Sequence, residues 1–299
     1  MELTIGPILF EWKREDVLRF YEEAAAMPVD RVYVGEVVCA KKRGVSLDDI
    51  GRIRDGLVKA GKKVTLSSLA VVSNEEELEL TRRLCGAHDS VEANDVSVLN
   101  MVDASKTEVF AGPHITSYNA PSIEFLKSIG VRRAVLPVEL PRESVAHNIK
   151  HGGLPAEVFS HGYLPLAFSW RCYTSRAYGL TKTGCKHHCG AHPEGMVLKT
   201  TDGRPLFRAN GTSILSADAY TLVELVEDLR EIGAAALRVS PQLRDTAKAV
   251  NVFRRRMDGV IGAKEALEEL RLISGGSLCN GWYMGGPGKD YLDAIVAAG

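Results

Sequence analysis

Short aliphatic runs alternate with amphipathic stretches along most of the chain. Residues 3–10 and 31–35 are apolar runs that predict strands, and residues 15–26 between them repeat apolar positions at helical spacing. Residues 47–60 predict a second helix, for which Ser46 is a suitable N-cap. The same alternation continues with predicted strands at 63–69, 90–93, 107–111, 131–137, 156–160 and 235–239, and predicted helices at 75–85, 96–101, 122–129, 142–150 and 222–232.

This order of elements predicts an α/β fold. Eight strands interleaved with helices indicate a parallel sheet, and a closed TIM-like (βα) barrel formed by one domain over residues 1–299 is the most economical arrangement. An open, doubly wound sheet is the main alternative, although no G-x-G-x-x-G motif follows the first strand.

Residues 169–215 interrupt the alternation. Residues 169–194 hold three cysteines and show little apolar periodicity, whereas residues 196–200 and 206–209 predict a small β-hairpin. We expect both parts to form one insertion between the seventh and eighth strands of the barrel.

Composition and charge narrow the class of protein. The chain has 37 Lys and Arg against 38 Asp and Glu, and a net charge of −1 excludes a generally basic nucleic-acid binder. No apolar run approaches the length of a membrane span, and the first residues lack a signal peptide, so we expect a cytoplasmic protein.

Three consecutive arginines, Arg254 to Arg256, predict the solvated end of a helix, with phosphate binding as the alternative.

The cysteines carry the strongest chemical signal. Clustered cysteines in a reducing compartment indicate metal or redox chemistry, because stable disulfides are disfavoured there. Three of them have the spacing Cys172-x12-Cys185-x3-Cys189 within the insertion. Cys39 follows a predicted strand by four residues, so in a barrel it lies on the C-terminal rim, onto which the insertion also opens. We expect these four thiols to form one metal centre.

The spacing alone leaves the metal open. Four thiolates suit either zinc or an iron–sulfur cluster. His187, His188 and His192 lie close enough in sequence to replace a thiolate at a zinc site. Structural zinc sites usually have two close pairs of ligands, whereas this chain has one close pair and two distant cysteines, which favours a cluster modestly. Three thiols in a loop without metal are the remaining alternative.

Polar side chains at the ends of predicted strands are candidates for catalysis, because in a barrel they point into the cavity at the C-terminal rim. Glu36 and His161 follow their strands immediately, and Arg238 belongs to the same group, with a structural role as the alternative for each. Cys85 closes an amphipathic helix and predicts a small buried hydrophobe, while Cys279 predicts a structural role with metal ligation as the alternative. No nucleophile elbow, H-E-x-x-H motif or P-loop is present.

Together, these motifs resemble the collagenase-like peptidase family of unknown catalytic type, number thirty-two of the U series, and in particular its branch in ubiquinone biosynthesis. The resemblance runs over nearly the whole chain, and the four-cysteine spacing is its specific part. It rests on the segment from Gly35 to Cys39, the three cysteines of the insertion, Asn210-Gly211 with Ser216, the segment from Leu237 to Pro241, and Cys279-Asn280-Gly281.

The resemblance implies a 4Fe–4S cluster on Cys39, Cys172, Cys185 and Cys189. It implies a subunit of an oxygen-independent hydroxylase that acts on the ring of a ubiquinone precursor, as a heterodimer with a UbiU-like paralogue. A UbiT-like lipid-binding accessory protein accompanies such a pair, and prephenate is the proposed hydroxyl donor. No nucleic-acid partner is expected.

Arg171 and Arg176 lie near Cys172 in sequence, and their charges would offset the negative charge of a cluster and raise its potential.

Three other functions remain open. The first is a zinc-containing, peptidase-like hydrolase, and the second is a non-catalytic scaffold subunit that carries a cluster. The third is the modification of RNA bases, as in the wider family, which the near-neutral charge disfavours.

Overall fold

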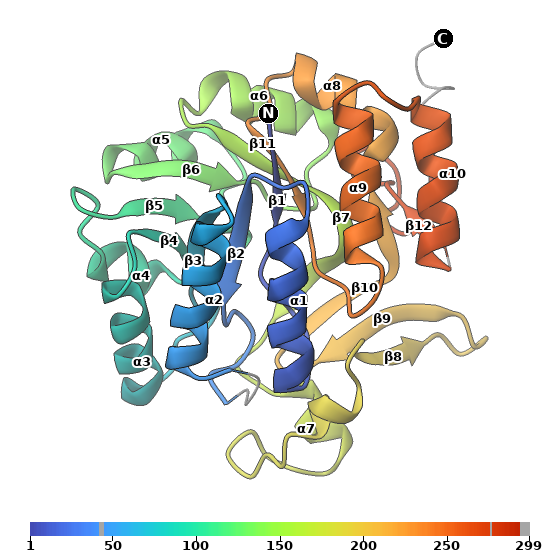
Figure 1. Cartoon of the computed structure of the whole chain (residues 1–299). Helices are drawn as coiled ribbons and strands as arrows, with labels where there is room; N and C mark the ends of the chain where they lie inside the picture. The colour runs from blue at the N-terminus through green and yellow to red at the C-terminus, as the bar shows by residue number, and fades with distance from the viewer. Residues whose placement is uncertain (42–44, 276, 294–299) are drawn as a thin grey trace.

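A closed parallel barrel forms the centre of the molecule. A computed structural model describes residues 1–41, 45–275 and 277–293 (Figure 1), so residues 42–44, 276 and 294–299 of the predicted 1–299 domain lie outside the described residues. The barrel strands are β1 (Glu2–Ile5), β2 (Arg31–Gly35), β3 (Lys63–Ser67), β4 (Ser90–Ala93), β5 (Glu108–Ala111), β6 (Val131–Val135), β7 (Ala156–Phe168) and β11 (Ala236–Val239). Neighbours in this order pair in parallel, and β11 closes the ring by pairing with both β1 and β7. The predicted TIM-like barrel is therefore confirmed.

Helices follow the strands and cover the outside of the barrel (Figure 1). Ser46 caps the second of them as predicted: its side chain accepts the N–H of Asp49 at 3.1 Å, and the Asp49 carboxylate accepts the N–H of Ser46 at 2.9 Å. Such a capping box satisfies two otherwise orphaned amides. The helices are α1 (Arg14–Ala26), α2 (Leu47–Lys59), α3 (Glu75–Gly86), α4 (Val96–Met101), α5 (Ala120–Ser128), α6 (Arg142–His151), α8 (Val226–Glu231), α9 (Thr246–Met257) and α10 (Ala263–Ser274).

The second half of β7 leaves the ring and starts an outer sheet. It pairs antiparallel with β10 (Ser213–Thr221), which pairs with β9 (Pro205–Asn210), and β9 pairs with β8 (Met196–Lys199). β8 and β9 form the predicted hairpin. The hairpin and the short helix α7 (Tyr173–Ala177) lie between the seventh and eighth barrel strands, as predicted.

The structure corrects the sequence analysis where β10 meets α8. The sequence predicts one helix over residues 222–232, but the strand β10 runs up to Thr221 and a 3₁₀ turn (Val223–Leu225) precedes α8. Leu215 and Ala219 are buried at even spacing along β10, as expected for a strand with one face on the core. A further short strand, β12 (Leu278–Cys279), pairs with β10.

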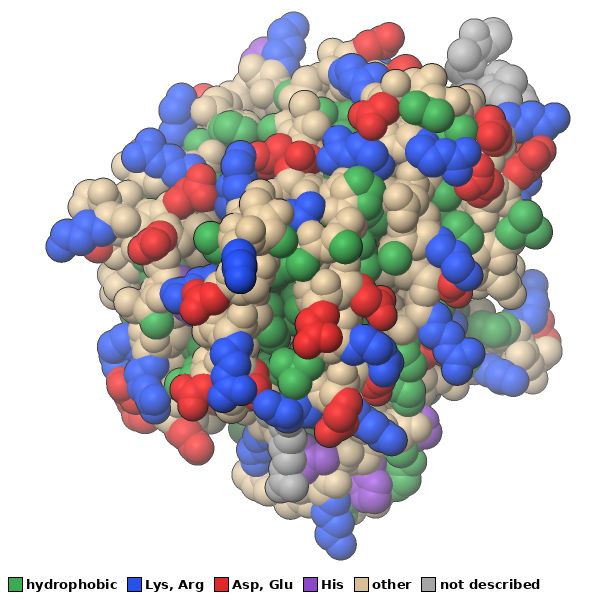
Figure 2. Space-filling view, viewed as in Figure 1, with side chains coloured by type: hydrophobic (Ala, Val, Ile, Leu, Met, Phe, Trp, Pro, Cys, Tyr) green, Lys and Arg blue, Asp and Glu red, His purple; other side chains and the backbone are tan. Residues whose placement is uncertain are grey.

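Charged groups of both signs are mixed over the face shown in Figure 2. Arg254, Arg255 and Arg256 form the last turn of α9, so the predicted helix end is confirmed, but it is not fully solvated because Arg256 is buried. Each of the three is paired with a carboxylate, and Arg254 contacts Asp30 at 2.7 Å. Over the part of the chain that the structure describes, no helix has the length and apolar character needed to cross a membrane.

The interior of the barrel is ionic, whereas TIM barrels are usually filled with branched aliphatic side chains. Arg238 on β11 donates to Glu157 and to Glu92, each at 2.7 Å, and its guanidinium lies 4.1 Å from the centre of the Tyr33 ring. Glu157 also accepts from the Tyr33 hydroxyl at 2.6 Å and from Arg133 at 3.2 Å. Arg238 is 2% exposed and both carboxylates are fully buried, so groups of the protein and not the solvent must compensate these charges.

The charges of this network reinforce each other. Burial alone would raise the pKa of Glu157, but the neighbouring Arg238 and Arg133 outweigh burial and hold that pKa at about 2. The pKa of Arg238 is raised, because the two carboxylates outweigh its own burial. Glu157 and Arg238 are therefore both ionised at neutral pH.

Replacing Arg238 by Ala should destabilise the fold strongly, because Glu92 and Glu157 would remain buried without their shared cation. Loss of one partner from a buried pair costs about 3–5 kcal/mol. Urea unfolding monitored by circular dichroism measures the change. Arg204→Ala is the control, since Arg204 pairs with Asp202 on the exposed hairpin and its loss should change the midpoint little. Equal urea midpoints of unfolding for the two variants would contradict a stabilising role of Arg238.

Candidate functional site at the carboxyl ends of the strands

The cysteine-bearing insertion lies at the carboxyl ends of the barrel strands. In Figure 1 the arrow of β2 points toward the end of the molecule where α7 and its adjoining loop lie. Loops at this end carry the active sites of TIM barrels.

Glu36 fixes the turn that carries Cys39. It directly follows β2, and its Oε1 accepts the backbone N–H groups of Val38 at 2.9 Å and of Cys39 at 3.2 Å. The predicted catalytic carboxylate therefore has a positioning role toward Cys39 in this structure.

A turn of the outer sheet joins the Cys39 segment to the Cys172 segment. The hydroxyl of Thr212 donates to the carbonyl of Val38, the residue before Cys39, at 2.7 Å. The carbonyl of Gly211 accepts the N–H of the residue after Cys172 at 2.7 Å. Two cysteines that lie 133 positions apart in the sequence are thereby tied to the same two-residue turn.

The loop with the other two cysteines is attached to the same place. The ammonium group of Lys41 donates to the carbonyl of Lys182 at 3.2 Å, which links the Cys39 segment to this loop. The ring of Tyr178, just after α7, stacks on His188 with centroids 4.1 Å apart, and its hydroxyl contacts His192 at 2.8 Å. The three segments that carry the four predicted ligands therefore converge.

The four thiols differ from ordinary core cysteines. Cys39, Cys172, Cys185 and Cys189 are all half-buried. The sulfur of Cys172 accepts the N–H of Ser175 at 3.3 Å, and that of Cys185 accepts a backbone N–H at 3.2 Å. Hydrogen bonds to sulfur tune the potentials of iron–sulfur clusters, so this donor set fits such a group.

The side chains do not form a compact single-ion site. Among the described residues, no three side chains of Cys, His, Asp or Glu are grouped as ligands of one metal ion. The four-thiol centre therefore stays a prediction. Arg171 and Arg176 are exposed, and the Arg171 guanidinium lies 5.2 Å from the centre of the Trp170 ring.

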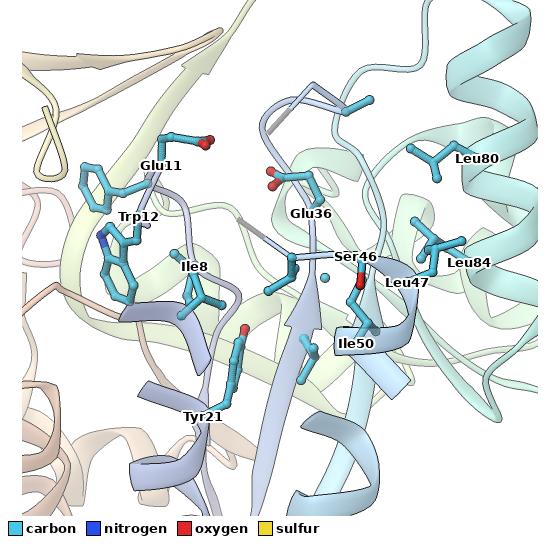
Figure 3. Close-up of a pocket in the computed structure, with 16 residues that line it drawn as sticks. Ile8, Glu11, Trp12, Tyr21, Glu36, Ser46, Leu47, Ile50, Leu80 and Leu84 are labelled. Atoms are coloured by element: carbon cyan, nitrogen blue, oxygen red, sulfur yellow. The ribbon is translucent and has the colours of Figure 1, made fainter. Parts of the chain in front are cut away.

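An apolar pocket of about 260 Å³ adjoins the Cys39 turn (Figure 3). Trp12 and Tyr21 stand on one side of it, with aliphatic side chains of α2 and α3 on the other. The carboxylates of Glu11 and Glu36 face each other across its upper part in this view. Burial, and then the charge of Glu36, raise the pKa of Tyr21, so its hydroxyl stays protonated. The pocket offers an aromatic wall and two carboxylates beside the cysteine segments.

Sequence analysis missed this pocket because it extends the first strand to residue 10. The strand ends at Ile5, and Gly6-Pro7 opens a loop that carries Phe10, Glu11 and Trp12 into the pocket. Pro7 was the available signal, since proline cannot donate to a strand ladder.

His161 and Arg238 lie within strands and not past their ends. β7 continues beyond residue 160, so His161 is an interior strand residue, 2% exposed, whose pKa burial lowers to about 4. Burial, and then the charge of Arg238, lower the pKa of His114 to about 3. Arg238 itself is fully engaged by Glu92 and Glu157 inside the barrel.

The two remaining cysteines are core residues. Cys85 on α3 is 3% exposed and Cys279 on β12 is 1% exposed. Burial raises the pKa of Cys85 to about 11 and that of Cys279 to about 12, so both stay thiols at neutral pH. The predicted role of Cys85 as a small buried hydrophobe is confirmed.

Comparison with known proteins identifies the family. Residues 18–293 match the model of Peptidase family U32. The 23S rRNA 5-hydroxycytidine C2501 synthase of Escherichia coli (strain K12) is 23% identical over 252 residues, which cover 80% of this chain and 38% of that protein. The tRNA hydroxylation protein P1 of Bacillus subtilis (strain 168) is 24% identical over 204 residues, which cover 62% of this chain and 48% of that protein. The chain spans less than half the length of both relatives.

Two solved structures superpose on the chain with TM-scores below 0.5. The U32 peptidase Mk0906 superposes with a TM-score of 0.48 at 10% identity, covering 81% of this chain and 93% of that one. The dihydrodipicolinate synthase of Aquifex aeolicus superposes with a TM-score of 0.44 at 10% identity, covering 91% and 78%.

Acidification should destabilise the fold before its carboxylates titrate. Between pH 6.5 and 4 the unfolded chain binds protons at His114 and His161 that the folded chain excludes, so the free energy of unfolding falls as pH falls. Urea titrations at pH 7.5, 6.5, 5.5 and 4.5 measure the slope. His161→Phe should flatten it, whereas His151→Gln, at an exposed histidine, should not. If the free energy of unfolding has the same dependence on pH in wild type and in His161→Phe, the lowered pKa of His161 is refuted.

Proposed function

Because the chain belongs to peptidase family U32, we propose that it is a UbiV-like 4Fe–4S subunit of an oxygen-independent hydroxylase that acts in ubiquinone biosynthesis. The observation that carries the proposal is the turn at Gly211 and Thr212. It ties the Cys39 segment to the Cys172 segment directly beside an apolar, aromatic-walled pocket. Both curated relatives are named for hydroxylation, which supports the reaction class.

Cys39, Cys172, Cys185 and Cys189 would hold the cluster in this proposal. A cluster supplies one-electron chemistry at a potential set by charge, hydrogen bonds to sulfur and exposure to solvent. The backbone N–H groups at Cys172 and Cys185 provide two of these hydrogen bonds. The exposed Arg171 and Arg176 supply positive charge on the insertion.

The pocket beside Cys39 is the proposed site for the substrate ring. At about 260 Å³ it suits a single substituted aromatic ring, and its apolar walls favour a quinone precursor over a charged metabolite. Trp12 and Tyr21 offer faces and edges for stacking. Glu11 and Glu36 lie where they could accept the proton of a ring hydroxyl.

The partners belong to the same proposal. A UbiU-like paralogue completes a heterodimer, a UbiT-like lipid-binding protein delivers the greasy precursor, and prephenate supplies the oxygen. Hydroxylation of an RNA base is the second candidate, because both curated relatives are named for RNA. The interspersed charges on the face in Figure 2 favour the smaller, neutral substrate.

Replacing Cys185 by Ala should remove the cluster. Protein purified without oxygen should contain about four irons and four sulfides per chain, with a brown colour, and the variant should lose most of both because one corner of the cluster has no ligand. Iron, acid-labile sulfide and zinc analysis together with visible absorption measure the change. Cys85→Ala is the matched control and should keep its iron, since Cys85 is buried in α3. Stoichiometric zinc without colour would overturn the proposal.

Cells that lack this chain should accumulate the unhydroxylated quinone precursor when grown without oxygen. Mass spectrometry of quinones and of RNA nucleosides from the same cultures distinguishes the two candidate substrates. Wild-type protein should restore hydroxylation and Cys185→Ala should not. Loss of a hydroxylated nucleoside with normal quinone content would establish the RNA function instead.

A further inference from the structure

A second cavity, of about 240 Å³, lies between β7, the outer sheet and the start of α9. It shares no lining residue with the pocket beside Cys39. Phe10 of that pocket and Tyr163 of this cavity meet edge to face, with ring centroids 6.0 Å apart. The lining is mostly polar, in contrast to the apolar walls of the first pocket.

Two buried polar atoms of this cavity have no partner within the described chain. His161 is 2% exposed, and burial lowers the pKa of its imidazole to about 4, so the ring is neutral at pH 7.5. Its Nδ1 is buried and makes no hydrogen bond, and the same holds for the hydroxyl of Ser274. Buried polar atoms are normally satisfied, so an orphan nitrogen and an orphan hydroxyl in one cavity indicate a missing partner. In the neutral tautomer that carries its proton on Nε2, Nδ1 is an acceptor and requires a donor.

The opposite wall attracts anions. α9 is twelve residues long, and Asp245 at its N-cap makes no side-chain hydrogen bond to the helix, so its first amides remain available. Arg244 lines the cavity, and among the described residues its side chain makes neither a hydrogen bond nor an ion pair. Arg208 lines it too, and donates to the main-chain carbonyls of Ala217 and Glu194.

The acidic side chains of the lining do not cancel this charge. Asp245 is paired with Lys248 at 2.6 Å. Glu194 is then the one uncompensated carboxylate among the lining residues, against two guanidinium groups. Counted together with Lys248, the lining side chains therefore carry a net charge of +1.

We propose that this cavity binds a small oxyanion that also carries a hydroxyl group: a hydroxycarboxylate or a hydrogen phosphate. The anionic oxygens accept hydrogen bonds from the Arg244 guanidinium and from the first amides of α9. The hydroxyl of the ligand donates to Nδ1 of His161. Ser274 donates its hydroxyl to the same ligand. This binding site goes beyond the proposed hydroxylase function and does not depend on the metal content of the chain.

Calorimetric titration of the full chain tests the site, with potassium phosphate, malate and succinate as probes at pH 7.5 and constant ionic strength. Phosphate and malate should bind saturably at one site per chain. Succinate has both carboxylates of malate without its hydroxyl and should bind about ten-fold more weakly, because Nδ1 of His161 then stays unpaired. A preference between phosphate and malate identifies which of the two ligand types the site takes.

Arg244→Gln should weaken binding of the preferred probe about ten-fold or more, since a charge-assisted contact is lost. Arg244 is exposed and makes no internal hydrogen bond, so the variant should fold normally. Arg52→Gln removes the same charge from an exposed position on α2 and should leave binding unchanged. Absence of saturable binding by both phosphate and malate, or equal weakening by the two variants, would overturn the site. Equal affinity for malate and succinate would overturn the role of His161.

Discussion

The shared ion pair of Arg238 with Glu92 and Glu157 is the constraint on which the barrel depends. Its members come from β11, β4 and β7, which are not all neighbours in the ring, so they meet only when the barrel is closed in one register. Replacing a buried pair with apolar side chains is often neutral for stability, whereas breaking it is costly. The network therefore acts mainly by making alternative registers expensive, and it fixes β4, β7 and β11 relative to one another.

The carboxyl ends of the strands in turn position the candidate site. The Cys39 turn leaves β2 and the cysteine insertion leaves β7, and neither contains enough regular structure to hold itself in place. The outer sheet supplies the missing support, since its turn at Gly211 and Thr212 contacts both segments. Pockets of opposite character then lie on the two sides of the Phe10–Tyr163 ring contact, one apolar and one positive.

Most of the barrel could be predicted because strands of a parallel sheet are buried on both faces and appear as apolar runs. The sequence fails where a strand changes environment: Gly162 and Pro165 mark the end of an ordinary strand, yet β7 continues through both into the outer sheet. The convergence of the three segments that carry Cys39, Cys172, Cys185 and Cys189 could be predicted from their spacing and from barrel topology. The cavity at Arg244 could not, since it arises from contacts between β7 and α9 that no short spacing encodes.

His161 occupies the fork of β7, where the strand pairs with Val239 of β11 on one side and with Thr221 of β10 on the other. Beyond this fork the hairpin of β8 and β9 extends outside the ring and ends in an exposed turn. Insertions or deletions in that turn would change the outline of the molecule without moving a barrel strand. The architecture therefore allows the surface offered to other molecules to change while the geometry of the barrel mouth stays the same.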